Sequence, residues 1–468
     1  MTTGWVCVRC DARMTASAAG FACERCGATG PVVGQIPVLV AHPEPYLSAT
    51  RMQLVTGRLA AMRQERAAQA GDDDAGRMAR ARRRVEAQNS NWGVVESLCA
   101  PALRAGSLEG SALDSFLVDR KTGWRLDRLA RYFVADWVDG APARDIVRHV
   151  ADLRGAFPGG GHAAVLGSGA GGLLTGLAPL FDRVTGVDLS LPALLLSSNL
   201  LAGGRFDLHV EHANWRCVSV SGAAPPSANV DLVAADAAAL PFASGSLSLV
   251  VTQYLLDIVA DPERVAGEIG RALAPGGVWL NLGLPFRLPR DGKEAPRRDA
   301  DDMDAFVSAS GFRMSRVDTV DLRHLDLSRI DASAGGVAHR ALLFAAQKIE
   351  EPPSDPLHAA LRGWFAGMEG ALTPLVLQHR RGAALFVSAT RVIGPTDEMV
   401  TEIQVGAGRR RPIDPAAAAF IETIWRAIGA ARPIGAILEA ARGGFEARDV
   451  VSVIERLRDL GAIECAQS

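Results

Sequence analysis

Apolar runs of four to eight residues recur through the middle of the chain, and several of them end at a glycine or an acidic residue. Runs of this length, bounded by turn residues, are typical of strands that are buried on both faces of a sheet. A helical pattern at 173–180 follows the first run, so we expect an α/β domain whose sheet is mostly parallel. The expected strands are 163–166, 184–188, 230–236, 246–253, 278–283, 313–320 and 341–348.

Helical patterns also precede this sheet. Residues 47–84 are rich in alanine, arginine and glutamate, and they predict two exposed helices joined by a polar segment at Asp72 to Asp74, with a break at Gly76. Further helices are expected at 92–103 and 124–149. The apolar residues of the last helix have the spacing of a single helix face, and they are Leu126, Leu129, Phe133, Trp137 and Ile146.

A separate module is expected after Glu350 to Pro353, which we interpret as a linker. A strand at 384–388 is followed there by helices at 415–428, 434–442 and 447–460, and this order resembles a small winged-helix domain. The chain therefore divides into four expected parts. They are a cysteine-containing segment at 1–42, a helical segment at 43–141, the α/β domain at 142–350 and the winged-helix-like domain at 351–468.

Composition and charge narrow the class of protein. The 468 residues are 48% apolar and 22% charged, with a formal net charge of -2, which is typical of a soluble globular protein of several domains. This charge gives no general attraction to nucleic acid or to an anionic membrane. The sequence contains neither a secretory signal nor an apolar stretch of about 18 residues, so we expect a cytoplasmic protein with no membrane contact.

Four of the seven cysteines lie within the first thirty residues, as Cys7-x2-Cys10 and Cys23-x2-Cys26. Two such pairs, twelve residues apart, have the spacing of a zinc ribbon, in which four thiolates close a tetrahedral shell. A site with all four positions filled by protein leaves no room for a catalytic water. We therefore expect a structural zinc ion bound by Cys7, Cys10, Cys23 and Cys26.

The first expected strand ends in Gly167-Ser168-Gly169-Ala170-Gly171-Gly172, and a helix follows. Glycines at a strand-to-helix turn allow a ligand to approach the backbone, and the helix start offers free amides. Asp188, about twenty residues later at the end of the second strand, is placed to accept hydrogen bonds from ribose hydroxyls. The pattern is shared by nicotinamide-dependent dehydrogenases and methyltransferases, so the turn alone leaves both classes open.

The following strands favour the second class. Asp236 and Ala237 follow the third strand and precede Leu240-Pro241-Phe242, and the strand at 246–253 and Leu273-Ala274-Pro275-Gly276-Gly277 come next. This series resembles class I methyltransferases that use S-adenosyl-L-methionine, whose Rossmann-like core has a seven-stranded sheet with an antiparallel terminal hairpin. The resemblance implies cofactor contacts, and the residues are Gly167, Ser168, Gly169, Asp188, Leu189, Asp236, Ala237 and Gln253.

Finer features resemble the carnosine N-methyltransferase family over residues 91–348. These features are the segment from Leu194 to Leu201, the segment from Val251 to Asp257, the segment from Gly276 to Gly283 and the helix through Asp136-Trp137. The resemblance implies methylation of an imidazole-type nitrogen in a small molecule or a peptide. Substrate-side positions depart from that family, since Arg287-Leu288 replaces a Tyr-His pair and Gly335-Gly336 replaces part of a tyrosine-rich stretch.

Transfer of a methyl group from a sulfonium requires mainly an aligned nucleophile and one proton acceptor. The candidates near the expected cleft are Asp257, Tyr254 and His212, and Asp257 is placed to orient or deprotonate an imidazole.

Two alternative functions stay open. A methyltransferase of RNA is the first, because zinc ribbons often accompany such domains, although the Arg82-Arg83-Arg84 and Arg409-Arg410-Arg411 runs are isolated. A non-enzymatic DNA-binding regulator built from the zinc ribbon and the winged helix is the second. The C-terminal module could also bind a peptide or a protein partner.

Overall fold

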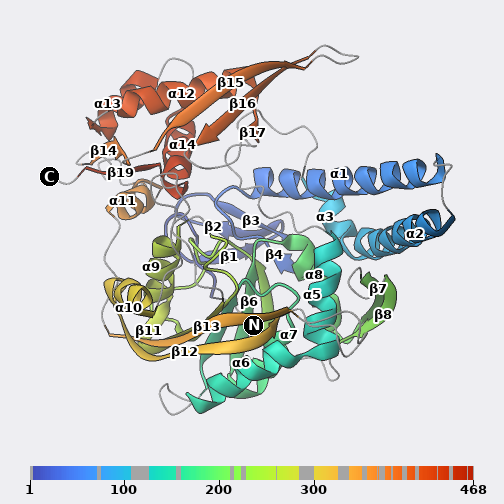
Figure 1. Ribbon diagram of the computed structural model, residues 1–468. Coiled ribbons are helices and arrows are strands. Elements are labelled where there is room, and N and C mark those ends of the chain that lie inside the picture. The colour runs from blue at the N-terminus through green and yellow to red at the C-terminus, as the bar shows by residue number, and fades with distance from the viewer. Residues whose placement is uncertain are drawn as a thin grey trace.

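The computed structural model describes residues 4–70, 75–106, 126–153, 160–210, 215–222, 228–259, 261–283, 300–324, 337–349, 356–365, 367, 375–380, 383–392, 398–405, 411–429, 431–441, 446–460 and 462–466. A seven-stranded mixed sheet lies at the centre of the described structure, an N-terminal ribbon lies above it, and a C-terminal module lies above the ribbon at the top of the view (Figure 1). Among the described helices, none combines the length and the apolar character that a membrane crossing requires.

The central sheet has the strand order β12-β13-β11-β10-β5-β6-β9. All neighbours in it are parallel except β13, which is antiparallel to both β11 and β12. The expected strands and the expected terminal hairpin are therefore present. Their bounds are β5 His162–Leu166, β6 Arg183–Asp188, β9 Val230–Ala234, β10 Leu247–Gln253, β11 Leu273–Gly283, β12 Phe312–His324 and β13 Val337–Lys348.

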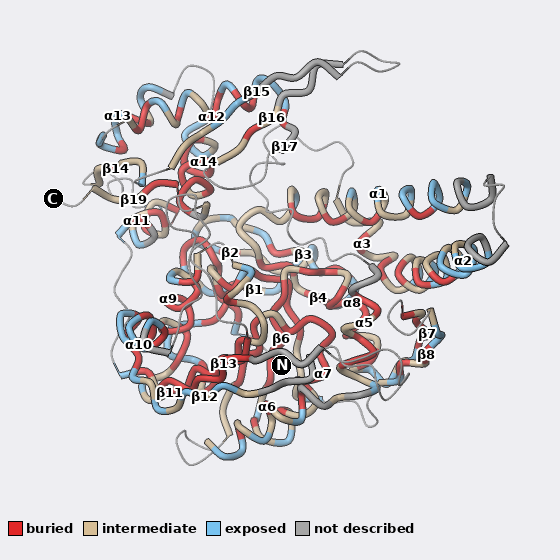
Figure 2. Tube along the Cα trace, viewed as in Figure 1, coloured by how far each residue is buried: buried red, intermediate tan, exposed pale blue. Residues whose placement is uncertain are grey.

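Helices cover both faces of this sheet, because its strands are apolar on both sides (Figure 2). Along β5, Ala163 and Val165 belong to one hydrophobic cluster and Ala164 and Leu166 to the other, as expected from the alternation of side chains in a strand. Helices α6, α7 and α8 contribute to the first cluster, and α9 and α10 to the second. The bounds are α6 Ala141–Asp152, α7 Gly172–Leu177, α8 Leu191–Leu201, α9 Pro262–Ala272 and α10 Ala300–Ala309.

The helix expected over 124–149 is not continuous. It consists of α5 (Leu126–Val134), a π-helix (Ala135–Asp139) and α6, with Gly140 at a positive φ of 62° between the last two. A further hairpin, β7 (Arg205–Val210) with β8 (Arg216–Ser221), was not predicted by the sequence. It packs against α2 (Ala75–Leu98), whose Asn91 side chain bonds the backbone of His209 in both directions.

The N-terminal part begins with residues 4–40, which we call the ribbon. The ribbon contains four short strands, β1 Met14–Ser17, β2 Gly20–Cys23, β3 Thr29–Val33 and β4 Ile36–Pro37. Helix α1 (Pro43–Ala70) follows and packs against α2 as a hairpin that projects beyond the sheet (Figure 1), and α3 (Ala100–Arg104) closes its base. The expected break at Gly76 is wrong, because this glycine lies within α2. The expected acidic joint at Asp72 to Asp74 lies outside the described residues.

The C-terminal module combines helices with two small sheets, β18-β14-β19 and β15-β16-β17. The expected strand at 384–388 begins β15, while its partner β16, helix α11 and strand β14 were not predicted. The expected linker at 350–353 lies outside the described residues. The bounds are α11 Pro356–Phe365, β14 Val376–His379, β15 Leu385–Val392, β16 Glu398–Val405, β17 Arg411–Pro412, α12 Pro415–Ile428, β18 Arg432–Pro433, α13 Ile434–Ala441, α14 Ala447–Asp459 and β19 Ile463–Cys465.

Candidate functional site

The glycine turn connects β5 to α7 at the carboxyl end of the central sheet. Gly167, Gly169 and Gly171 have φ angles of 71°, 53° and 81°, in the left-handed region that a side chain disfavours. The amides of Gly167 and Ser168 both donate to the carbonyl of Val187, at 2.9 and 3.0 Å, which ties the turn to β6. Glycine is required at these positions because the turn needs a backbone conformation that other residues disfavour.

Asp188 lies beside this turn at the end of β6 and is buried. Its Oδ2 accepts a hydrogen bond from the amide of Gly169 at 2.8 Å, and its Oδ1 accepts one from the amide of Ser190 at 2.7 Å. Burial raises the pKa of the Asp188 carboxyl, and these amide bonds act in the opposite direction. Each carboxylate oxygen has two lone pairs, so the group could also accept hydrogen bonds from two ribose hydroxyls.

Leu189, which follows Asp188, is held from the far N-terminal side. The hydroxyl of Tyr46, in the first turns of α1, donates to the Leu189 carbonyl at 2.7 Å. Tyr46 is buried, and burial together with the nearby Asp188 charge raises the pKa of its phenol. Tyr46 could not be predicted as part of the site, because nothing in its local sequence pattern links α1 to β6.

The turn after β9, residues 235–242, carries the candidates Asp236 and Ala237. Asp236 is exposed, and its Oδ1 accepts the amide of Ala238 at 2.9 Å, so one oxygen shapes the turn. Ala237 is buried. Helix α9 holds the turn from below, since Arg271 donates to the carbonyls of Leu240 and Phe242, at 3.0 and 2.7 Å.

Gln253 ends β10, and the chain then bends sharply at Tyr254, a non-glycine residue with a positive φ of 48°. Such strained conformations concentrate at functional sites. The amide of Tyr254 donates to the carbonyl of Leu282 on the adjacent strand at 2.8 Å. A Cβ on Gly283 would lie 3.3 Å from the Tyr254 nitrogen, so glycine allows β11 to pack closely against this bend.

Asp257 lies in the same bend. Its Oδ1 is buried, and no described residue donates a hydrogen bond to it. Burial raises the pKa of the Asp257 carboxyl, and a hydrogen bond from its own backbone amide acts in the opposite direction. The pKa of Tyr254 is also raised, by burial and then by the charges of Asp257 and Tyr132. The structure thus groups Tyr254 and Asp257, whereas the third candidate, His212, lies outside the described residues.

A buried polar chain supports the strand that carries this bend. The Trp279 indole donates to the Thr252 hydroxyl at 2.9 Å, and that hydroxyl donates to Asn281 Oδ1 at 2.9 Å. The Trp279 ring also packs edge-on against Phe344, with centroids 5.0 Å apart. The Trp-x-Asn-x-Gly pattern is therefore explained by packing and by hydrogen bonds behind the site.

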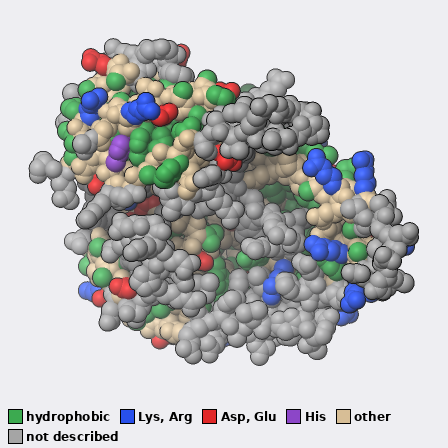
Figure 3. Space-filling view, turned by 45° about the horizontal axis from the view of Figure 1, so that its top comes forward, with side chains coloured by type: hydrophobic (Ala, Val, Ile, Leu, Met, Phe, Trp, Pro, Cys, Tyr) green, Lys and Arg blue, Asp and Glu red, His purple; other side chains and the backbone are tan. Residues whose placement is uncertain are grey.

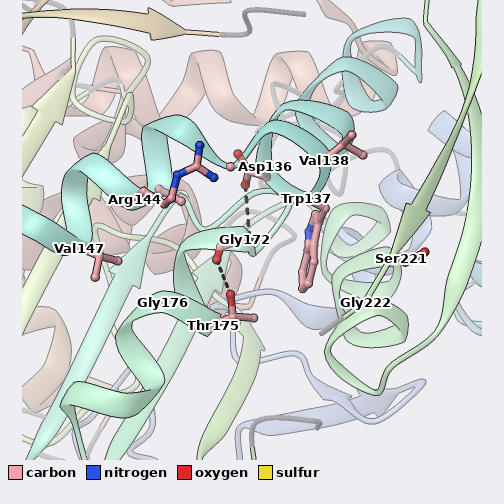
Figure 4. A pocket seen from close by; sticks show the side chains of 12 residues that line it. Asp136, Trp137, Val138, Arg144, Val147, Gly172, Thr175, Gly176, Ser221 and Gly222 are labelled. Carbon is pink, nitrogen blue, oxygen red and sulfur yellow. Dashed lines mark hydrogen bonds between the residues drawn. The ribbon is translucent and has the colours of Figure 1, made fainter. Parts of the chain in front are cut away.

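A pocket of about 440 Å³ opens next to the glycine turn, between the π-helix, α6 and α7 (Figure 4). The Asp136 carboxylate lies against the start of α7 and accepts the amide of Gly172 at 3.3 Å, while the Trp137 indole donates to the Ala170 carbonyl at 2.7 Å. Burial raises the pKa of Asp136 to about 7. The sequence contained a weak signal for this wall in the Asp136-Trp137 pair, but did not assign it to the site.

The four expected zinc ligands are brought together in the ribbon. The sulfur atoms of Cys7, Cys10, Cys23 and Cys26 all lie within 4.8 Å of one another, with Cys7 and Cys26 at 3.5 Å and Cys10 and Cys23 at 3.4 Å. Four cysteine sulfurs this close, most of them buried, match the donor set and size of a tetrahedral zinc site.

Comparisons with known proteins agree with this geometry. Residues 165–280 match the family described as Methyltransferase domain, which spans β5 to β11 and includes the glycine turn, Asp188 and Asp257. No curated protein sequence shows a significant match to the chain.

Solved structures similar to this chain include three methyltransferases. One is a Bacillus halodurans protein assigned as a methyltransferase (14% identity, TM-score 0.31, 44% of this chain and 99% of that chain). Another, from Haloferax volcanii, is in complex with the Trm112 methyltransferase activator (15% identity, TM-score 0.32, 48% and 96%). A third is an S-adenosylmethionine-dependent methyltransferase from Methanosarcina mazei (17% identity, TM-score 0.30, 43% and 98%).

The family match and the strand order together favour an enzyme over a non-enzymatic DNA-binding regulator. The α/β domain of this chain is a Rossmann-like, S-adenosylmethionine-dependent methyltransferase domain of class I.

Proposed function

We propose that the chain transfers a methyl group from S-adenosyl-L-methionine to a nitrogen atom, of the imidazole type, in a small molecule or a peptide. The observation that carries this proposal is the Asp257 carboxyl. It is partly buried, it follows the strained Tyr254 in the bend after β10, and no described residue donates a hydrogen bond to its buried Oδ1. Such a group favours a substrate that brings its own N–H donor.

The cofactor, when bound, supplies an activated methyl group on a sulfonium. Asp188 and the amides of the glycine turn would hold its ribose and polar atoms, and the turn at Asp236 and Ala237 its adenine. Gln253 would lie near its methionine part, and Ser168 and Leu189 would line the same cleft.

Asp257 would accept a hydrogen bond from the substrate N–H and orient the ring, so that the other nitrogen lone pair points at the methyl carbon. The donor would supply the methyl group, so that a nitrogen–carbon bond would replace its carbon–sulfur bond and the positive charge would pass to the ring. The Asp257 carboxylate would then accept the ring N–H proton, and the product would leave neutral. The Tyr254 hydroxyl, whose raised pKa keeps it protonated, would act as a hydrogen-bond donor at the same edge.

Methyl transfer to imidazole-containing dipeptides, primary amines and carboxylic acids tests this assignment, with products located by mass spectrometry and nuclear magnetic resonance. We expect the imidazole compounds to react, and kcat/KM to rise with pH through an inflection above the usual range of an aspartate, because the base must be ionised. Asp257→Asn should lower kcat at least about 100-fold and remove that inflection. Methylation confined to oxygen or carbon atoms would refute the nitrogen assignment.

We also propose a structural zinc ion on the ribbon cysteines. Their mutual distances and their burial support it, because a cluster of four thiols in a small fold is rarely stable without a metal. All four ligand positions come from the protein, so the ion would organise the ribbon and take no part in methyl transfer. Metal analysis of the purified chain should give one zinc per molecule, and Cys10→Ser should abolish it.

RNA as the methyl acceptor is the second candidate, and the α1–α2 hairpin favours it. Its two helices carry nine arginines and four glutamates. In Figure 3, blue side chains gather on the side of the molecule that carries these helices. Its exposed distal arginines are Arg63, Arg66, Arg80, Arg82, Arg83 and Arg84.

Affinity for RNA decides between the two acceptors. An RNA substrate predicts binding that weakens steeply as salt is raised, and that weakens further when Arg82, Arg83 and Arg84 are changed to glutamine. Arg426→Gln, an exposed arginine of the C-terminal module, is the matched control. Absence of salt-dependent binding would exclude this candidate.

A further inference from the structure

The ribbon lies against the turn that follows β9 and contacts both of its ends. Where the chain leaves the ribbon, Val38 pairs in parallel with Ala234, the last residue of β9, and the amide of Leu39 donates to the Ala234 carbonyl at 2.8 Å. Val38 and Leu39 are both buried. The ribbon therefore adds a short strand to the edge of the central sheet, at the point where the candidate adenine turn begins.

At the other end of the turn, the first strand-like residues of the ribbon make the contact. The amide of Val6 donates to the Pro241 carbonyl at 3.1 Å, and Trp5 pairs with Phe242, with ring centroids 5.7 Å apart. Val6 directly precedes Cys7, one of the four clustered cysteines. The position of this contact thus depends on the geometry of the cysteine cluster.

The first turn of α1, which follows the ribbon, reaches the end of the neighbouring strand as well. Tyr46 bonds the Leu189 carbonyl, directly after Asp188. A Cβ on Gly34, in the β3–β4 turn, would lie 2.7 Å from the side chain of Leu195 in α8, so the ribbon packs closely against the helix that follows Asp188. The residues that would contact adenine and ribose are both held from outside by the N-terminal segment.

We propose that metal binding to the ribbon cysteines and binding of the methyl donor are coupled, each raising the affinity for the other. The ribbon holds Ala234 and Pro241 at a fixed separation only while its own strands are ordered, and four clustered thiols, three of them buried, require a metal for that order. The proposal rests on the donor and zinc sites proposed above. The ribbon would then position the residues that contact the cofactor.

Linkage makes the coupling measurable in two directions, since two ligands must alter each other's affinity by the same factor. With S-adenosylhomocysteine as the probe, calorimetry on full-length zinc-loaded and zinc-stripped protein should show a Kd at least about fivefold weaker without zinc. Reciprocally, S-adenosylhomocysteine should lower the equilibrium release of zinc to a competing chelator by the same factor. The second measurement uses the loaded wild-type protein, so it remains valid even where the stripped protein unfolds.

Trp5→Ala tests the contact between the ribbon and Phe242 without removing a zinc ligand. This variant should retain one zinc but bind S-adenosylhomocysteine more weakly, because it loses the packing against Phe242. Val32→Ala, at a 43% exposed ribbon position, is the matched control and should bind as the wild type does.

Equal affinity for S-adenosylhomocysteine with and without zinc, together with zinc release that the probe does not change, would overturn the coupling while leaving both sites intact. No binding of the probe to loaded protein would instead refute the donor site. Binding of the probe to a chain that takes up no zinc would refute the metal site, and the coupling with it.

Discussion

At the scale of single residues, the candidate site depends on groups whose environment the sequence does not reveal. The glycines of the turn and Asp188 could be predicted, since their spacing reflects a backbone requirement and a strand end. Tyr46 could not, because it reaches the site only through tertiary packing from a helix with no motif of its own. Asp136 was indicated only by a family resemblance of its helix, and its contact with Gly172 also depends on tertiary packing.

Asp136 should make stability depend on pH. Its pKa is raised to about 7 in the folded chain, well above its value in an unfolded chain, so the folded state binds the extra proton and loses stability as pH rises toward 7. Asp136→Asn should remove this dependence of stability on pH while keeping an acceptor for the Gly172 amide. From pH 5 to pH 8 the variant should gain roughly 2 kcal/mol relative to the wild type.

Chemical denaturation of both proteins at a series of pH values measures that difference. Asp145→Asn on α6, whose exposed ion pair with Arg148 spans one helix turn, serves as the control and should leave the pH dependence unchanged. Parallel curves for the wild type and Asp136→Asn would show that the carboxyl titrates normally.

Thr252 should matter to stability through its two buried hydrogen bonds. Thr252→Val keeps the shape but leaves the Trp279 indole and Asn281 Oδ1 without this partner, so the free energy of unfolding should fall by about 1–3 kcal/mol. Thr252→Ser keeps the hydroxyl and should lose less. A loss in Thr252→Val that is no larger than the loss in Thr252→Ser, measured by thermal denaturation, would show that these hydrogen bonds stabilise the core no more than the methyl group does.

At the scale of elements, the strands of the central sheet could be predicted because apolar runs and turn residues bound them closely. The β7–β8 hairpin was missed, since its strands alternate apolar and polar residues over only six positions each. The interrupted helix before β5 was missed for another reason. Its apolar spacing continues through the π-helix, so periodicity alone does not show the break.

Helix α9 should control the turn that carries Asp236. Arg271 bonds two carbonyls of this turn and also pairs with buried Glu268, which accepts the amide of Leu240 at 2.9 Å. Arg271→Ala should lower the free energy of unfolding by roughly 2 kcal/mol and weaken cofactor binding. Arg271→Lys keeps the charge but cannot bond both carbonyls, so it should restore stability more than affinity. Loss of stability without any loss of affinity would separate α9 from the site.

At the scale of the whole molecule, the order of parts along the chain could be predicted, but their contacts could not. The C-terminal module meets the ribbon and α9 through Arg362, which contacts Asp11 and lies 3.1 Å from Glu268. Arg9 of the ribbon lies over the Phe365 ring, with its guanidinium carbon 4.8 Å from the centroid. Arg362 and Asp11 are 351 positions apart and Arg362 and Glu268 are 94 apart, so no local pattern encodes these contacts.

Arg362→Ala should loosen the C-terminal module without unfolding it. Removing the guanidinium breaks both ion pairs, while Glu268 keeps Arg271. Hydrogen exchange of the α11 amides should become faster by about fivefold or more, and exchange in the central sheet should stay the same. Arg380→Ala, which removes an exposed pair within the module, is the control. Unchanged exchange in α11 would mean that apolar packing alone holds the module in place.

Binding of S-adenosylhomocysteine to the full-length chain, measured by calorimetry, tests the central claim most directly. We predict one site per chain, a Kd raised about tenfold or more by Asp188→Ala, and no change with Asp231→Ala, which removes a carboxylate at the opposite end of the same pair of strands. Absence of binding to the wild type, or binding to Asp188→Ala with wild-type affinity, would contradict a methyl donor site at the glycine turn.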